Sequence, residues 1–361
     1  MLRIGPGDLR VIRCYQRLPP RSGGMETHIQ ALSNIQTREN VEVVSVFNSG
    51  NAPEPYMHIW PSLTLDFVKP AIIRDIVFYS GLKIANLPHT ERKHTVMHIH
   101  GDYSAFAIGK WLSRRLGIRH LFASFHGRAR ASASIYSSSL RNYSYVFATG
   151  FAEYKIFKEN IAAPVAHTPS PPKDLFFNKW NGGPLSDVIS VGSLVKVKQF
   201  EIIVQCAIRL PNLKFSIYGE GPERPKLEKL IEESRCNNIT IHGSASSREI
   251  AAAMQSSRVF INVSSEEGTP TAALEALASG LPVVLTPAND YSFLVQNGYN
   301  GYITSGWDLD EILSFINICV NDERNRRIMS NNARSVASRY NWHDLGGAVT
   351  EMMLRAISID K

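Results

Sequence analysis

The sequence is poor in cysteine and has no long uninterrupted hydrophobic run. Its 361 residues include four cysteines, none in a C-x-x-C pair or at a metal-ligand spacing from a histidine. This favours neither a zinc site nor a disulfide framework, and we expect a reducing compartment, the cytoplasm. No stretch reaches the roughly 18 apolar residues of a transmembrane helix, and the first ten residues lack the apolar core of a signal peptide. At most, we expect peripheral contact with the cytoplasmic face of the inner membrane.

Acidic residues are scarce in the first half of the chain. Residues 1–180 contain 22 Lys and Arg against 12 Asp and Glu, whereas residues 181–361 contain 17 against 20. A basic half can face nucleic acid, anionic lipid or a phosphorylated substrate, and composition does not choose among them. With 44% hydrophobic and 20% charged residues, disorder, collagen and coiled coil are excluded as the main structure. The length predicts two domains.

Short runs rich in β-branched residues alternate with segments of helical period, which predicts parallel strands joined by crossover helices in an α/β fold. The boundary between the halves falls in residues 164–184, where five prolines and a Gly-Gly pair interrupt any helix or strand. We expect a Rossmann-like domain over residues 1–165, a linker over 166–184 and a second Rossmann-like domain over 185–340. The expected strands are 9–15, 41–47, 95–100, 121–125, 145–149, 188–191, 214–218, 239–242, 259–263, 282–286 and 301–304.

The most informative segment is residues 264–287, SSEEGTPTAALEALASGLPVVLTP. It predicts a strand, a turn at Gly268 and a helix with Thr269 as N-cap and Pro270 in the first position, ending at Gly280. Such a helix start is a natural anion site. Glu275 lies among Ala and Leu, so we expect hydroxyl or N–H partners for it. Without a family resemblance, Glu266 and Glu267 could equally be solvated loop charges and Glu275 an ordinary carboxylate on the face of a helix.

This segment resembles the E-x7-E region of the retaining glycosyltransferases of family 4, which have the GT-B fold, two Rossmann-like domains facing each other across a cleft. The resemblance implies that Glu267 lies beside the donor sugar and that Glu275 binds the ribose. It also implies that the turn between them places backbone N–H groups by the diphosphate, through Gly268, Thr269, Pro270 and Thr271.

Residues 190–230 resemble the family's first strand and phosphate-binding turn in the second domain. The resemblance implies that Lys198 binds phosphate and that Gly221 lines the nucleotide side. The family's arginine is Ser193 here, and its glycine after the lysine is Gln199. Either another basic residue such as Lys196 takes over, or the donor is held differently, or the protein binds without efficient turnover. Asn289-Asp290 and Phe293 also depart from the family pattern.

In the first half, Gly23 and Gly24 precede a helix and resemble the family's Gly-Gly loop, which reaches donor phosphate and acceptor. Arg21 is a further candidate for anionic ligand groups on the acceptor side. A histidine at a strand end is more often structural than catalytic, but His126 resembles the family histidine that faces the transferred sugar. The resemblance also implies that His100 and Asp102 lie in a loop on the side of the acceptor substrate. The last segment, residues 341–361, resembles the family's final helix, which returns to the first domain.

The resemblance implies a retaining glycosyltransferase that needs no metal or cofactor. The donor is a nucleotide-sugar, with UDP favoured and GDP next, and the catalytic residues are His126, Glu267 and Lys198. The acceptor is a glycan or lipid-linked glycan of cell-surface polysaccharide synthesis, such as lipopolysaccharide O-antigen. The basic segments 67–87 and 110–120 suggest contact with an anionic membrane, although ordinary crossover helices explain each segment singly.

Three rival functions remain open. A catalytically weak sugar-nucleotide binder is suggested by Ser193. A Rossmann oxidoreductase would need a third glycine at Arg224, after Gly219 and Gly221. A nucleic-acid binder would use the basic half, but no recognised module is present, and we expect no nucleic-acid partner.

Overall fold

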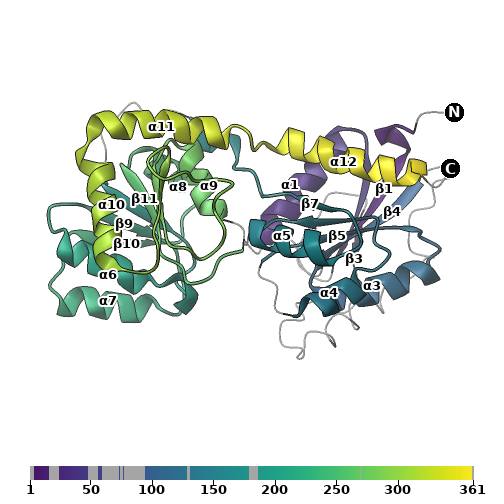
Figure 1. Ribbon diagram of the computed structural model, residues 1–361, viewed down its shortest axis with the longest axis horizontal. Coiled ribbons are helices and arrows are strands. Elements are labelled where there is room, and N and C mark those ends of the chain that lie inside the picture. Colours follow the sequence, from purple (N-terminus) through teal and green to yellow (C-terminus); the bar gives the residue numbers. More distant parts are fainter. Residues whose placement is uncertain are drawn as a thin grey trace. The chain divides into compact units, whose positions relative to one another are not determined.

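A computed structural model describes residues 4–15, 24–47, 56–58, 73, 76, 94–127, 131–178, 186–268 and 270–359 (Figure 1). The chain divides into two compact units. The first comprises residues 1–170 together with 342–361, and the second comprises residues 171–341. Each unit is described by itself.

The first unit contains a parallel sheet in the order β3-β2-β1-β4-β5-β6-β7. Its strands are β1 (Leu9–Cys14), β2 (Glu42–Phe47), β3 (Tyr56–His58), β4 (His94–Gly101), β5 (His120–Phe125), β6 (Tyr145–Ala148) and β7 (Val165–His167). Its helices are α1 (Gly24–Arg38), α3 (Tyr103–Arg115), α4 (Ala133–Ser139), α5 (Phe151–Asn160) and α12 (Trp342–Ile359).

Both faces of this sheet are covered by helices. Successive residues of a strand point to opposite faces, so each strand contributes to two cores. On β1, Ile12 packs into the core shared with α3, α4 and α5, whereas Val11 packs into the core shared with α1 and α12. The last helix is tied to α1 by the hydrogen bond from the Gln36 side-chain amide to the Thr350 hydroxyl, at 3.0 Å. The C-terminal segment thereby completes the core of the first unit.

The second unit contains a parallel sheet in the order β10-β9-β8-β11-β12-β13. Its strands are β8 (Val188–Val191), β9 (Phe215–Tyr218), β10 (Ile239–Gly243), β11 (Val259–Asn262), β12 (Val283–Leu285) and β13 (Gly301–Ile303). Its helices are α6 (Phe200–Arg209), α7 (Arg224–Glu233), α8 (Ser247–Gln255), α9 (Thr271–Ala278), α10 (Leu309–Asn321) and α11 (Glu323–Ala337), with 3-10 turns at Asp174–Phe177 and Lys196–Lys198.

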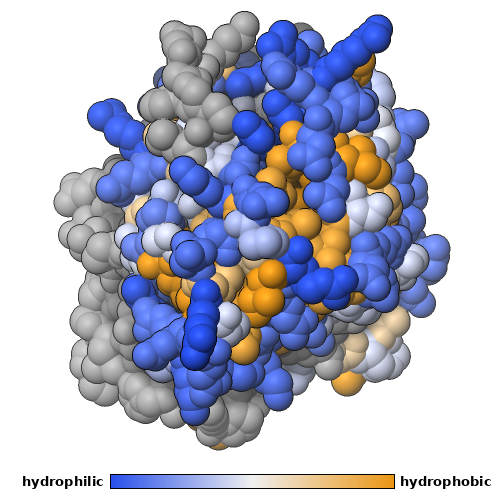
Figure 2. All heavy atoms as spheres, turned by 90° about the vertical axis from the view of Figure 1, so that its left-hand side faces the viewer, coloured by the Kyte–Doolittle hydropathy of each residue, from blue (hydrophilic) through white to orange (hydrophobic). Residues whose placement is uncertain are grey.

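This sheet is also buried on both faces. One core includes Phe200 of α6 and Ile316 of α10, and the other includes Leu274 of α9 and Ala333 of α11. Figure 2 views the molecule from the side of α6, α7 and α10 and shows a largely hydrophilic surface with apolar patches between the charged side chains.

In each sheet the strand order reverses direction next to the first strand. The reversal falls between β1 and β4 in the first unit and between β8 and β11 in the second. Ligands of open α/β sheets bind outside the carboxyl ends of the strands at this point. The loops after these strands are therefore the places to look for a site.

The α/β prediction is confirmed, and every strand expected from the sequence coincides with a strand of the structure within about two residues. The short strands β3 and β7 were not expected. β7 (Val165–His167) overlaps the start of the range given to the linker, 166–184, and its pairing with β6 makes it part of the first sheet. The expected helix start at Thr269–Pro270 is one residue early. Pro270 is the N-cap with ψ 55, which is not helical, and Thr269 lies outside the described residues.

Candidate functional site

Lys198 and Glu267 lie where the second sheet reverses its strand order. Lys198 ends the 3-10 turn that follows β8, and Glu267 lies in the loop that follows β11. Because β8 and β11 are parallel neighbours, these two loops emerge at the same edge. The backbone N–H of Ser265 donates to the carbonyl of Val197 at 2.8 Å, which joins the two loops directly.

Glu267 is held by three donors on one oxygen. Its Oε1 accepts from Lys198 Nζ at 2.5 Å, from Ser264 Oγ at 2.8 Å and from Asn262 Nδ2 at 2.9 Å. The residue is 9% exposed, so this charge needs such partners. Its Oε2 has no hydrogen-bond partner in the part of the chain that the structure describes. One oxygen therefore fixes the carboxylate, and the other can accept from a ligand hydroxyl.

The loop that carries Glu267 is fixed from its other side by Asn289. The Asn289 side-chain amide donates to the carbonyls of Glu267 at 2.9 Å and Gly268 at 2.6 Å. Asp290, the next residue, accepts from the backbone N–H of Ser292 at 2.9 Å. Asn289 and Asp290, which replace the Gly-Gly pair of the family, thus add hydrogen bonds to the loop. The sequence alone had also allowed a less tightly held loop.

The residue after Lys198 has a left-handed backbone. Gln199 has φ 48° and ψ 42°, a conformation that favours glycine. This is the position where the resembling family has glycine, so Gln199 takes the backbone of the missing glycine at some cost in strain. Ser193 and Lys196 in the same loop are exposed, and neither is among the side chains that donate to Glu267.

The Gly219 and Gly221 positions bring two loops into close contact. A Cβ on Gly221 would lie 2.3 Å from the carbonyl oxygen of Leu194, and Gly219 has φ 151° with an equally close approach to Gly192. The backbone N–H of Leu194 donates to the carbonyl of Glu220 at 2.9 Å. Gly221 therefore packs closely against the loop of Lys198. Its predicted contact with the nucleotide-sugar stays a prediction.

Glu275 lies on α9, eight residues after Glu267, with its side chain partly exposed. Burial raises the pKa of Glu275 to about 7, and the charge of Lys173 partly offsets this. Its side chain has no hydrogen bond to any described residue, so the expectation of hydroxyl or N–H partners is wrong for this part of the chain. Thr271 begins α9. The partly exposed carboxyl group thus has no hydrogen-bond partner among the described residues and can accept from a ligand hydroxyl.

The first unit gathers four histidines near the point where its own sheet reverses. His98 and His100 lie on β4, His126 follows β5, and His28 lies on α1. His100 Nδ1 and His126 Nε2 are 2.9 Å apart, and the ring of His28 meets that of His126 edge-on at 4.8 Å. The two histidines predicted from the sequence, His100 and His126, are thus direct partners.

These histidines are neutral at pH 7. Burial lowers the pKa of His126 to about 4. It also lowers the pKa of His28, His98 and His100 well below the ordinary value, with further lowering by neighbouring histidines and by buried Arg13. Among the described residues no group of three or more His, Cys, Asp or Glu could hold a metal ion. The cluster therefore offers neutral hydrogen-bonding groups. His28 and His98 were not predicted. Nothing in the local sequence marks His28, whereas His98 lies two residues before His100 and so on the same face of the strand, a signal that could have found it.

Other predicted residues of the first unit have clear local roles. Gly24 is the first residue of α1, whereas Gly23 and Arg21 lie outside the described residues. Asp102 caps α3 by accepting from the backbone N–H of Tyr103 at 2.8 Å, and it also accepts from the Tyr136 hydroxyl. Its predicted place beside the acceptor substrate stays a prediction.

Sequence comparison places the second unit in a known family. Residues 174–336 match the family model described as glycosyl transferases group 1. These residues form a group 1 glycosyltransferase domain. The match contains both Lys198 and Glu267, and it confirms the expected enzyme class, a glycosyltransferase.

Relatives of the group 1 domain bear glycosyltransferase names. The sulfoquinovosyl transferase of Arabidopsis thaliana is 28% identical over 158 residues, which are 43% of this chain and 30% of that protein. An uncharacterized glycosyltransferase of Methanocaldococcus jannaschii is 24% identical over 259 residues, 68% of this chain and 71% of that protein. The chain thus spans less than a third of the plant relative.

Solved structures share the fold over nearly the whole chain. Sucrose-phosphate synthase from Thermosynechococcus elongatus has a TM-score of 0.81 and 14% identity, covering 97% of this chain and 100% of that chain. HepE of Anabaena, solved with UDP and glucose, has a TM-score of 0.72 and 15% identity, covering 95% and 98%. The GT-B fold class is confirmed. No helix among the described residues is long and apolar enough to cross a membrane.

Proposed function

We propose that this chain is a retaining, metal-independent glycosyltransferase that moves a sugar from a nucleotide-sugar to a hydroxyl of a glycan or glycolipid. The observation that carries the proposal is the Lys198–Glu267 pair at the strand-order reversal of the group 1 domain, with Ser264 and Asn262 on the same carboxylate oxygen. A cation and a fixed carboxylate meet here, one suited to a diphosphate and the other to sugar hydroxyls.

Lys198 contributes the charge that the leaving group requires. Negative charge develops on the diphosphate oxygen as the glycosidic bond breaks, and a preorganised cation stabilises that charge in the transition state. The Lys198 side chain is 24% exposed, so a ligand can reach it. Neutralisation by Lys198 and by the start of α9 supports a mechanism without a metal ion. The solved HepE complex with UDP supports a UDP-sugar as the donor.

The proposed reaction is a same-face displacement. The acceptor oxygen forms a bond to the anomeric carbon while the bond from that carbon to the diphosphate oxygen breaks, and the acceptor proton passes to the departing diphosphate. Glu267 orients the sugar through Oε2, and no covalent sugar–Glu267 bond forms. Glu275 accepts from a ribose hydroxyl. Isolation of a kinetically competent glycosyl-Glu267 adduct would disprove this role.

His126 takes part as a neutral group. With a pKa of about 4, its ring carries no charge at pH 7 and exchanges hydrogen bonds with sugar hydroxyls. Its Nε2 is already engaged by His100 at 2.9 Å, which leaves Nδ1 for the sugar. His100 thus positions the ring.

The acceptor is proposed to be a lipid-linked or cell-surface glycan, as in lipopolysaccharide O-antigen synthesis. On α3, the indole of Trp111 is 54% exposed and the guanidinium of Arg115 lies 4.9 Å from its ring centre. Such a basic, amphipathic surface suits the interface of an anionic membrane on its cytoplasmic side. Most of the other basic segment, residues 67–87, lies outside the described residues.

A thermal-shift screen of nucleoside diphosphates and their sugars tests the donor, because a ligand that binds the folded state raises the melting temperature. We expect one nucleotide series to stabilise the protein and its sugar to be transferred or hydrolysed equally well with and without EDTA. Stabilisation without transfer or hydrolysis would favour the weak sugar-nucleotide binder, which the exposed Ser193 in place of the family's arginine makes the second candidate. No shift with any nucleotide would contradict both.

A further inference from the structure

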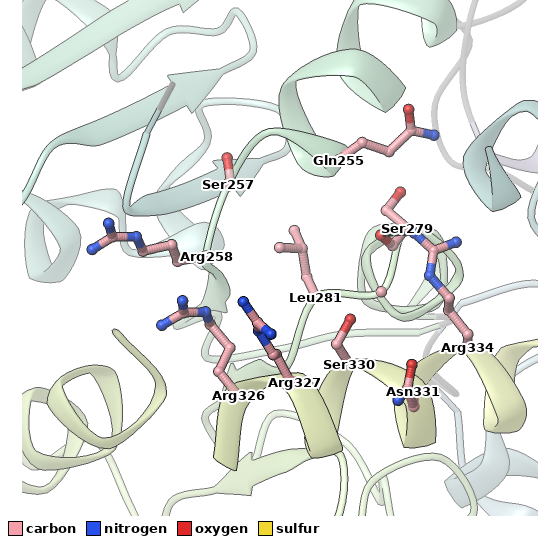
Figure 3. Close-up of a pocket in the computed structure, with 11 residues that line it drawn as sticks. Gln255, Ser257, Arg258, Ser279, Leu281, Arg326, Arg327, Ser330, Asn331 and Arg334 are labelled. Atoms are coloured by element: carbon pink, nitrogen blue, oxygen red, sulfur yellow. Dashed lines mark hydrogen bonds between the residues drawn. The ribbon is translucent and has the colours of Figure 1, made fainter. Parts of the chain in front are cut away.

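The second unit has a basic cavity apart from the Lys198–Glu267 pair. It has a volume of about 350 Å³, within the size range of small-ligand pockets, and four of its lining residues are arginines. Figure 3 shows Arg326 and Arg327 rising from α11, Arg258 on one side wall and Arg334 beside Ser279 on the other. We call this space the arginine cavity.

The arginine cavity lies at the opposite edge of the sheet from the proposed donor site. Arg258 immediately precedes β11 and Leu281 lies just before β12, so both line the cavity from the amino ends of the strands. Glu267 follows the carboxyl end of β11. Since all strands of this sheet are parallel, a ligand in the cavity would not occupy the place of the nucleotide-sugar.

Two of the four positive charges have carboxylate partners. Arg258 pairs with Asp187 at 3.0 Å, and Arg327 pairs with Glu323 at 2.6 Å. Arg326 has no ion pair within the described part of the chain; its Nη1 donates to the carbonyl of Val320 at 2.6 Å. Its other guanidinium nitrogens make no hydrogen bond to a described residue.

Arg334 also lacks a carboxylate partner among the described residues. It donates to the carbonyls of Ala278 at 3.0 Å and Ser279 at 2.7 Å, at the end of α9, and to those of Phe177 at 3.0 Å and Asn178 at 3.5 Å. Burial lowers the pKa of Arg326, the nearby charges of Arg258 and Arg327 lower it further, and the Glu323 carboxylate partly offsets this. Like charges that converge in this way are unfavourable unless an anion joins them.

Two buried polar atoms of the cavity residues are also unsatisfied. Ser279 is 4% exposed, and its Oγ has no hydrogen-bond partner among the described residues. Arg258 Nε is buried and equally without a partner there. Buried polar groups are normally hydrogen-bonded, so an unsatisfied hydroxyl beside two guanidinium groups that lack carboxylate partners among the described residues points to a ligand with several acceptor oxygens.

We propose that the arginine cavity binds the phosphate group of a small phosphorylated molecule. A phosphate monoester carries close to two negative charges at neutral pH, which matches the two arginines without carboxylate partners. Guanidinium groups bind phosphate oxygens in a bidentate fashion, and Ser279 Oγ donates to a further oxygen. The cavity has room for an organic group attached to the phosphate.

Calorimetric titration with glycerol 3-phosphate at constant ionic strength, with glycerol as the neutral control, tests the proposal. We expect saturable binding of glycerol 3-phosphate and none of glycerol. Loss of a charge-assisted hydrogen bond weakens binding by about 10- to 100-fold, and we expect this for Arg326→Gln. Since Arg326 also binds backbone carbonyls, Ser279→Ala serves as a second variant. Ser279→Ala removes a hydroxyl that has no partner in the described structure, so it should not lower the melting temperature while it weakens binding.

Two control variants separate this cavity from other basic groups. Arg209→Gln removes an arginine of the same unit whose ion pair with Asp310 is exposed and lies outside the cavity. Lys198→Met removes the cation of the proposed donor site. Both should bind glycerol 3-phosphate as the wild type does. The proposal is overturned if the wild type does not bind at millimolar concentration, if the cavity variants bind like the wild type, or if Lys198→Met alone abolishes binding.

Discussion

Replacing Gln199 by glycine is expected to stabilise the second unit. A non-glycine residue in the left-handed region destabilises the folded state by about 1–2 kcal/mol, and glycine removes this strain. Glycine also loses more conformational entropy on folding, which offsets about 0.5–1 kcal/mol of the gain. Gln199 Oε1 is also buried with no hydrogen-bond partner among the described residues, and removing an unsatisfied acceptor recovers about 1 kcal/mol or more. The sum predicts a rise of about 1–2 kcal/mol in the free energy of unfolding.

Scanning calorimetry measures this change, with Gln199→Ala as the matched control. For a unit of this size, 1–2 kcal/mol corresponds to a rise of about 2–8 °C in the melting temperature. Gln199→Ala removes the amide but keeps the Cβ, so it recovers the acceptor contribution and not the backbone strain. Glycine should therefore exceed alanine. A Gln199→Gly protein no more stable than Gln199→Ala would show that the left-handed backbone is not strained here.

Four further predictions follow from the contacts of single side chains. Lys198→Met should lower kcat for donor turnover by about 100-fold or more, because a transition-state charge contact is lost, while Lys229→Met, an exposed lysine of α7, should leave kcat unchanged. Asp102→Ala should lower the free energy of unfolding by about 1–2 kcal/mol through loss of the α3 cap, and Asp102→Asn by less, in urea denaturation. Because the pKa of Glu275 is raised from 4.5 to about 7, its contribution to stability should fall as pH rises through this range; Glu275→Gln should flatten that part of a melting-temperature profile. Because the pKa of His126 is lowered from 6.5 to about 4, its contribution should be lost as pH falls from 6.5 to 4, and His126→Gln should reduce that loss.

Much of the fold could be predicted from the sequence because parallel strands buried on both faces leave a strong local signal. Runs such as 188–191 and 259–263 are apolar and bounded by turn residues, and both became strands of the second sheet. β3 and β7 have three residues each, as β12 and β13 also have, but unlike β12 each includes a histidine and lacks a longer apolar run around it. They exist because a neighbouring strand supplies hydrogen-bond partners, which is information that the local sequence does not contain.

The site was predictable as single residues and not as a network. Glu267 and Lys198 were each assigned a role through the family resemblance, but their contact joins positions 69 residues apart in the sequence. Ser264 and Asn262 carry no local mark of their bond to Glu267. The same holds for His28, which lies on an ordinary amphipathic helix and meets His126 through tertiary packing alone.

The most direct test of the account is a titration of a UDP-sugar against the wild type and Lys198→Met. The account predicts saturable binding by the wild type and binding at least about tenfold weaker by the variant, since one charge-assisted contact to the diphosphate is lost. Lys229→Met should bind as the wild type does. If Lys198→Met binds the donor as tightly as the wild type, the diphosphate does not lie at Lys198 and the proposed site is wrong.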